Sequence, residues 1–337
     1  MKSICRFLFV LLTVLVFNSC STKVVVNADY QDITVVYGLL NQNDSIHYIK
    51  INKAFIGDNN AYVMATDPAL SNYNPSDLDV YMEEWENGQH VSTFSFDTTS
   101  IYNKEPGIFY YPNQYVWKAA HKLNPNNSNY NNEFEYKLFV LNKTTGKIIS
   151  SSTKLIQKFS VTAPTGFTIG FASNKVASWK TAVNGRRYEL IFRFHYSEKD
   201  AGGIITQHAV DVNFGSQKSS DIQGGKVMEE TYGQSFFSMI SFLIPVNPNV
   251  TRVCGMVDLI VLVGGDDLST YIDVNAPTGS PIFDRPDYTN VNNGIGIFSC
   301  RYDNSIEYPR SYTLDGRSKD SVLYGRYTKN LSFVPSF

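Results

Sequence analysis

The clearest pattern along the chain is a strict alternation of apolar and polar positions across residues 188–196. One face of the extended chain would carry only large apolar side chains, Tyr188, Leu190, Phe192, Phe194 and Tyr196. A helix repeats its faces about every 3.6 residues, so it cannot produce this alternation. The pattern therefore predicts a half-buried strand, with its polar face formed by Glu189, Arg193 and His195.

Shorter runs of the same kind fill the first half of the chain. We expect strands at 33–40, 47–51, 78–83, 91–96, 115–117, 134–140 and 148–155. Turn-forming residues separate these runs, as at Glu86-Asn87-Gly88-Gln89, where a hairpin is expected. Short strands at this spacing favour a β-sandwich over residues 25–157. The long connection at 57–76 is expected to hold a helical turn near Ala61 to Ala65.

One segment of this first domain resembles a known sandwich. Leu123, Pro125 and Tyr136 are similar to the residues around strands E to G of immunoglobulin-like and fibronectin type III domains. The resemblance implies an immunoglobulin-like sandwich in which the Tyr136 hydroxyl bonds the backbone at the corner. The insertion at 126–132 is longer than in those domains.

The second domain is expected to span residues 158–337, beginning near Pro164-Thr165-Gly166. Strands are predicted at 169–172, 176–179, 188–196, 206–214 and 256–263. Because Met256 to Val263 is apolar throughout, we expect that strand to be buried on both faces. One or two short helices are expected, the first capped by Ser235 and stopped by Pro245, the second at 268–272 with an aspartate cap. The fold class is therefore mainly β.

Charge and composition limit the classes of partner that we expect for this protein. The chain has 29 basic and 31 acidic residues, with a formal net charge of −2. These charges are spread along the sequence without a basic stripe, so nucleic acid is not an expected partner. The 22 tyrosines and 22 phenylalanines favour strands over helices.

The first twenty residues have the pattern of a secretion signal. Lys2 and Arg6 precede an apolar run from Phe7 to Phe17, which is shorter than the roughly 20 residues that span a bilayer. Ser19-Cys20 then resembles the lipobox of bacterial lipoproteins. That resemblance implies a signal peptide at 1–20 and acyl chains, palmitate among them, on Cys20. An ordinary cleaved signal with an incidental cysteine is the alternative.

The residues after Cys20 indicate on which side of the outer membrane the folded part of the protein lies. Surface-exported lipoproteins of the Bacteroidota usually carry an acidic run there, whereas Ser21 to Val26 contains no acid. We therefore expect a lipid-anchored body at the outer membrane that faces the periplasm.

The C-terminal part carries a further resemblance. Residues 280–286 (SPIFDRP) and 290–298 (NVNNGIGIF), with the opening strand Val36-Tyr37-Gly38-Leu39, resemble an uncharacterised Bacteroidota lipoprotein family that carries a domain of unknown function numbered 4249. Members are often encoded beside TonB-dependent outer-membrane transporters, which implies an accessory role in uptake. The family offers no catalytic residues to carry over.

Motifs for catalysis or metal binding are missing from the sequence. The 5 histidines have no second ligand at metal spacing, and neither a zinc-protease motif nor a nucleophile elbow occurs. Gly294-x-Gly296 lacks the third glycine of a dinucleotide site. The pair Asp266-Asp267 is better explained as a helix cap than as a calcium site. We expect no enzyme, no cofactor and no metal.

Two other features stay open in the sequence. Cys254 and Cys300 could pair in an oxidising envelope or lie apart as small buried residues. Tyr110, Tyr111, Tyr115 and Trp117 are candidates for stacking on a glycan or gripping a peptide, although a sandwich core also consumes aromatics.

These observations favour a non-enzymatic outer-membrane lipoprotein, an accessory or ligand-binding partner of a TonB-dependent uptake system. The alternatives are a fimbrillin-like structural subunit and a glycan-binding surface lipoprotein. Fimbrillins are commonly cleaved after an arginine near the first strand, and this chain has no arginine between Arg6 and Arg186.

Overall fold

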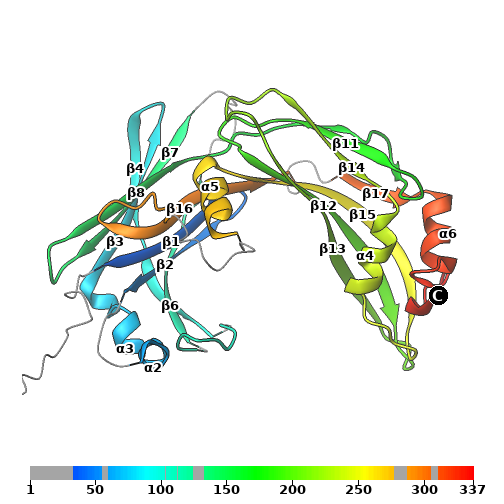
Figure 1. Cartoon of the computed structure of the whole chain (residues 1–337), viewed down its shortest axis with the longest axis horizontal. Helices are drawn as coiled ribbons and strands as arrows, with labels where there is room; N and C mark the ends of the chain where they lie inside the picture. The colour runs from blue at the N-terminus through cyan, green and yellow to red at the C-terminus, as the bar shows by residue number, and fades with distance from the viewer. Residues whose placement is uncertain are drawn as a thin grey trace, which may run out of the picture.

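The computed structural model describes residues 33–54, 60–102, 104–111, 113–123, 133–276, 287–304 and 310–337. The fold is mainly β, with 51% strand and 15% helix, as the sequence predicts. Two β-rich lobes form the two sides of an arch (Figure 1). Cys20, Pro125 and residues 280–286, on which several predictions depend, lie outside the described residues.

The first lobe is a sandwich of two antiparallel layers. Its inner side chains alternate along each strand, and Ile49, Met82, Trp117 and Leu138 are each at most 1% exposed. One layer has the order β4 (Gln89–Ser95), β3 (Leu78–Glu86), β7 (Phe134–Asn142), β8 (Ile148–Lys154). The other runs through β1 (Thr34–Asn41), β2 (Ile46–Lys53), β6 (Gln114–Ala120) and β5 (Asp97–Ile101). The predicted immunoglobulin-like sandwich is confirmed.

A strand from near the end of the chain completes this second layer. β16 (Gly294–Asp303) runs parallel to β1 over the whole of β1, with Val36 opposite Gly296. At its far end β16 also pairs with β15 (Thr251–Gly264), Leu262 lying opposite Asp303. One sheet therefore continues from the first lobe into the second, and it crosses the domain boundary predicted between residues 157 and 158.

The second lobe is built on three long antiparallel strands. β12 (Arg187–Lys199) lies between β13 (Ile205–Lys218) and β15, and β15 pairs in turn with β17 (Arg310–Leu314), which holds β10 (Thr168–Ile169). A separate sheet has the order β14 (Val227–Tyr232), β11 (Lys175–Lys180), β9 (Val161–Ala163). The second β-rich domain is thereby confirmed.

Aromatic packing fills the core of this lobe. The Phe171 ring stacks on Phe236 with centroids 3.9 Å apart and meets Phe192 edge-on at 5.1 Å. Phe236 belongs to α4 (Ser235–Leu243), which buries Phe236, Phe237 and Ile240. Such rings supply a large buried area and prefer offset-stacked or edge-to-face contacts. The alternating strand therefore finds its apolar partners in a helix and a small sheet.

Two helices begin differently from the sequence prediction. Ser235 is the first residue of α4 and makes no capping bond, with Gln234 before it. α5 (Asp266–Asn275) has Gly265 at its N-cap, so Asp266 and Asp267 lie in the first turn. Carboxylates there interact favourably with the positive end of the helix dipole without capping it.

Other elements were not predicted or differ in detail. α6 (Gly316–Tyr324) was missed although Asp315 caps it by accepting a bond from the Ser318 N–H at 2.8 Å. Strand β15 is buried mainly on one face, because Met256 is 44% exposed while Val257 is buried. α2 (Ala61–Ala65) confirms the predicted turn, and α3 (Pro68–Ser71) with the 3-10 turns Pro75–Asp77 and Lys329–Leu331 completes the fold.

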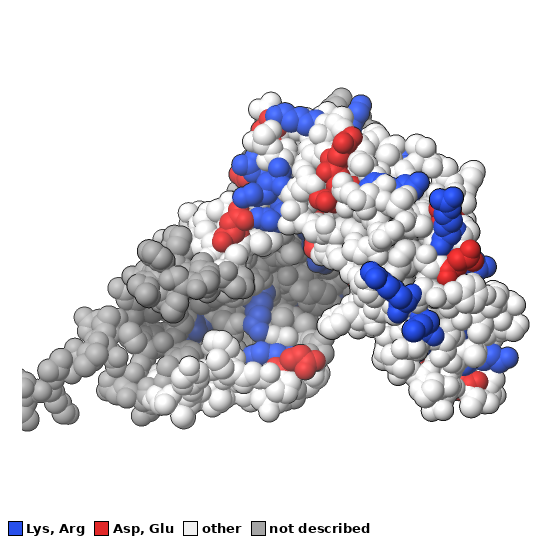
Figure 2. Space-filling view, turned by 45° about the vertical axis from the view of Figure 1, so that its right-hand side comes forward, with Lys and Arg blue, Asp and Glu red and all other residues white. Residues whose placement is uncertain are grey.

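Across the described ranges, no helix is both long and apolar enough to cross a bilayer. On the face shown in Figure 2, basic and acidic side chains are interspersed and form no large patch of one sign. This distribution agrees with the scatter of charge along the sequence.

The pairing of β1 with β16 requires a glycine at position 296. Its φ is +115°, and a Cβ added there would lie 2.0 Å from the Val36 carbonyl oxygen. We predict that Gly296→Ala lowers the free energy of unfolding by about 2–4 kcal/mol. Gly316→Ala is the control, because a Cβ at Gly316 meets nothing within 4 Å. Urea denaturation would measure both, and equal stabilities would contradict the prediction.

Candidate functional site

The predicted aromatic site is split by the alternation of β6. Trp117 lies opposite Ile49 and is 1% exposed, so it belongs to the sandwich core and cannot stack on a ligand. That part of the prediction is wrong, since alternate residues of a strand point to opposite faces. Tyr111 and Tyr115 are exposed, whereas Tyr110 is half-buried and its N–H donates to the Ala65 carbonyl at 3.1 Å.

Cys254 and Cys300 are free thiols that lie near opposite ends of β15. Cys254 lies near the start of β15, whereas the Cys300 carbonyl accepts a bond from Gly265, just beyond the end of β15. Ten residues of strand separate these points by about 33 Å, far beyond the reach of a disulfide. Burial raises the pKa of each thiol to about 11, so both stay protonated at neutral pH. The open alternative resolves to two separate thiols, of which Cys300 is buried and Cys254 is half-buried.

A serine, a histidine and an aspartate do meet on the outer face of the second lobe. His195 Nε2 lies 2.7 Å from Asp258 Oδ2, and the Ser311 hydroxyl donates to the other oxygen of the same carboxylate. In a catalytic triad the histidine stands between the other two. Here the aspartate stands between them, so the imidazole does not contact the hydroxyl it would have to deprotonate.

The remaining histidines are held by ordinary structural contacts. His208 lies opposite Tyr196 and stacks on it, on the other face of the sheet from His195. His47 is buried, with Nε2 2.9 Å from the His121 carbonyl, and burial lowers its pKa. His121 in turn bonds Glu84 at 2.8 Å. Within the described part of the chain, no three potential ligands group to hold a metal ion.

A cavity of about 490 Å³ opens at the base of the second lobe. Two of the segments that connect the lobes enter here: the chain after β8, at 157–161, and the residue that follows β16, Asn304. The lining is completed from β11, the turns after it, and β17. In full it comprises Gln157, Lys158, Phe159, Ser160, Val161, Lys180, Thr181, Val183, Gly225, Asn304 and Arg310.

Backbone bonds hold these segments together. The Gln157 N–H donates to the Val183 carbonyl at 3.0 Å, and the Lys180 N–H donates to the Ser160 carbonyl at 2.9 Å. Gly225 is fixed in the same way by the Thr181 carbonyl, at 2.8 Å. The walls of the cavity are therefore a hydrogen-bonded frame rather than free loops.

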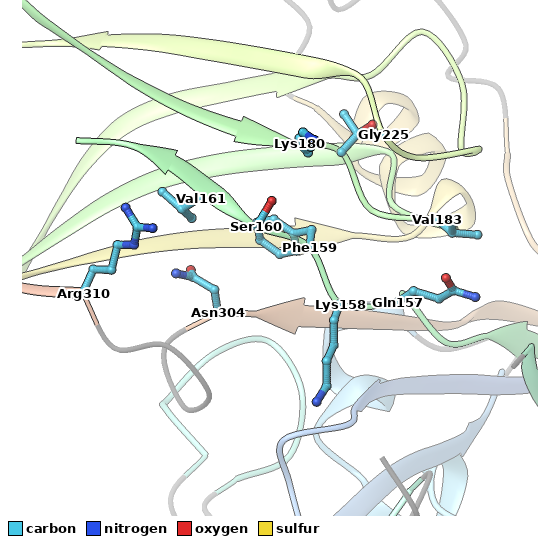
Figure 3. A pocket seen from close by; sticks show the side chains of 11 residues that line it. Gln157, Lys158, Phe159, Ser160, Val161, Lys180, Val183, Gly225, Asn304 and Arg310 are labelled. Atoms are coloured by element: carbon cyan, nitrogen blue, oxygen red, sulfur yellow. The ribbon is translucent and has the colours of Figure 1, made fainter. Parts of the chain in front are cut away.

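The charge of the lining is one-sided. Among the described residues, the lining includes Lys158, Lys180 and Arg310 and no carboxylate. Arg310 uses Nη1 to donate to the Pro164 carbonyl at 2.9 Å, and this bond fixes the guanidinium beside Val161. In Figure 3 the Lys158 ammonium extends away from the cavity, while Arg310 and Asn304 turn toward the same space.

One polar atom at the cavity has no partner. Asn304 is 3% exposed, and its Oδ1 accepts a bond from the Val261 N–H at 2.7 Å. That bond assigns the other end of the amide as Nδ2, which is buried without a hydrogen-bond partner. Buried donors are nearly always paired, so an unpaired one needs an explanation.

Apolar side chains form the opposite wall. Phe159 meets the rings of Tyr188 and Tyr302 edge-on, with centroids 6.1 and 5.9 Å away. Val161 and Val183 lie beside it. A small number of polar groups against an apolar wall is the usual composition of a small-molecule site.

None of the cavity residues stood out in the sequence. They come from five separated stretches of chain, and no spacing links them before the sheet is assembled. The unbroken series of basic and neutral residues at 157–161 is the only local sign, and it is too short to distinguish from a surface linker.

In the comparisons with known proteins, no family profile matches this chain, and no curated protein matches it. The lipobox and the C-terminal resemblance therefore remain predictions from the sequence.

Two neighbours on β6 test which aromatics are free to bind. We predict that Trp117→Ala lowers the free energy of unfolding by about 3–5 kcal/mol because it removes a buried ring. Tyr115→Ala, at a side chain that is 45% exposed, is expected to change it by no more than about 1 kcal/mol. Urea denaturation of both variants checks this, and a stable Trp117→Ala protein would refute the core position.

Proposed function

We propose that this chain is a non-enzymatic binding protein, held at the outer membrane by acyl chains on Cys20 and acting beside a TonB-dependent transporter. The cavity at the base of the second lobe is its ligand site. The tether and the partner rest on the lipobox and on the C-terminal resemblance. The cavity is the observation that favours binding as the role of the folded body.

Three properties of the cavity support this proposal. Its volume, about 490 Å³, falls within the range of small-molecule sites. Its frame is fixed by backbone bonds, so the site is preformed. Its lining combines an apolar wall with two cations, Lys180 and Arg310, that have no carboxylate partner among the described lining residues.

Binding is favoured over catalysis by the arrangement of Ser311, Asp258 and His195. The serine hydroxyl donates to the carboxylate, and the imidazole bonds to the other oxygen of that carboxylate. This order places no imidazole beside the serine to act as its general base. In the part of the lining that the structure describes, Ser160 and Thr181 are the hydroxyls, and neither a histidine nor a carboxylate is present to activate them.

The position of the tether agrees with an accessory role. β1 begins at Thr34 and belongs to the first lobe, so an anchor at Cys20 would hold that lobe at the membrane. The second lobe, on the other side of the arch (Figure 1), would extend from it with the cavity near the junction. In such an arrangement the body could present a ligand to a neighbouring channel.

The tether and the partner can be tested together. We predict that wild-type protein fractionates with the outer membrane and that its pull-down recovers a TonB-dependent channel. Cys20→Ala should release the protein into the soluble fraction, because several acyl chains are needed for a lasting anchor. Cys254→Ala is the matched control and should stay membrane-bound. A soluble wild-type protein would contradict the anchor, and repeated recovery without any channel would contradict the accessory role.

A further inference from the structure

We propose that the cavity at the base of the second lobe binds a small organic acid, with the carboxylate held by Arg310 and Asn304 and attracted by the charge of Lys180. This inference rests on the proposed binding function and names the class of ligand. It follows from the charge of the lining, the unpaired donor of Asn304 and the apolar wall.

Two positive side chains lie in the described lining without an acidic neighbour there. The eleven lining residues that the structure describes hold no Asp or Glu, so a negative group inside would meet Lys180 and Arg310 without a competing carboxylate from these residues. Toward the described residues, Arg310 donates from Nη1 alone, to the Pro164 carbonyl. Its other guanidinium N–H groups remain to donate, and a planar fork of this kind matches the two oxygens of a carboxylate.

Asn304 supplies the second, independent observation. Its side chain is held by the bond from the Val261 N–H to Oδ1, so Nδ2 has a fixed direction. Figure 3 shows this amide turned toward Arg310 and Val161. Leaving such a buried donor unpaired costs free energy. A ligand oxygen at this point would accept its hydrogen and recover that cost.

The apolar wall determines which chemical group suits the rest of the ligand, beyond its carboxylate. Phe159 is braced by Tyr188 and Tyr302 and presents a fixed aromatic surface, with Val161 and Val183 on either side. A compact ring or short hydrocarbon body suits this wall, and the carboxylate would point to Arg310 and Asn304. A cavity of about 490 Å³ has room for a small molecule and excludes a folded macromolecule.

The test compares acids with neutral analogues of the same shape. Benzoate, phenylacetate and glucuronate are titrated by calorimetry into the folded protein, against benzamide, phenylacetamide and glucose. At least one acid is expected to bind at least tenfold more tightly than its neutral counterpart, because charge-assisted bonds are the stronger ones. Equal binding within every pair, or no heat from any of the three acids at concentrations up to about 10 mM, overturns the proposal.

Variants then assign the site. Arg310→Gln and Lys180→Gln should each weaken binding of the preferred acid by about tenfold, and Asn304→Asp should weaken it further by placing a negative charge at the contact. Asn304→Asp retains an acceptor for the Val261 N–H, and urea denaturation confirms that it folds. Lys175→Gln is the control, since Lys175 lies at the other end of β11 from Lys180. Equal effects at positions 175 and 180 would show non-specific charge attraction and refute the site.

The result separates this inference from the proposed function. Loss of acid binding in Arg310→Gln with continued recovery of a channel leaves both standing. If no acid binds the wild type while the channel is still recovered, the ligand class is wrong and the accessory role stands. If acids bind as predicted and no channel is ever recovered, the accessory role is wrong and the site stands.

Discussion

The parallel pairing of β1 with β16 is the interaction on which the rest of the structure depends. It inserts a strand from near the end of the chain into the sheet with which the described fold begins. The approach is close enough that two glycines are required. A Cβ at Gly38 would lie 2.8 Å from the Phe298 side chain on β16, and one at Gly296 would meet the Val36 carbonyl. Because β16 also pairs with β15, the same strand fixes one lobe against the other.

The cavity is a consequence of that constraint. Asn304 follows β16 directly, and Arg310 begins β17, so both are positioned by the strand that joins the lobes. The opposite wall is the segment at 157–161, by which the chain first enters the second lobe. A ligand held there would touch two of the connections between the lobes. Binding would then stabilise the junction itself, by mass action on the folded state.

The order of apolar and polar residues predicted those elements whose structure depends mainly on the local sequence. The strand around Phe192 was identified because strict alternation leaves no other structure, and the helix at 235–243 because Phe236 and Ile240 share a face before Pro245. Trp117 was misjudged because an aromatic near a loop looks the same in sequence whether it points inward or outward. Its partner Ile49 decides the matter, and that pairing is a long-range contact.

The missed elements share a cause. β14 and β17 are short strands with mixed composition, held by pairing with β11 and β15 rather than by their own pattern. α6 carries a clear cap at Asp315, but its few apolar residues give a weak periodic signal. The cavity was beyond prediction because it needs all of these elements in place. The sequence cannot show that the Asn304 amide nitrogen is unpaired, because only the structure shows that the Val261 N–H bonds the amide oxygen.

β16 makes the two lobes one cooperative unit. Native-state hydrogen exchange in increasing urea measures this coupling by following amides of β7 in the first lobe and β12 in the second. Both sets are expected to merge into a single global unfolding transition with one free energy. If one lobe exchanged through its own unfolding at a much lower free energy while the other stayed protected, the shared strand would not couple the lobes, and the cooperative unit would be disproved.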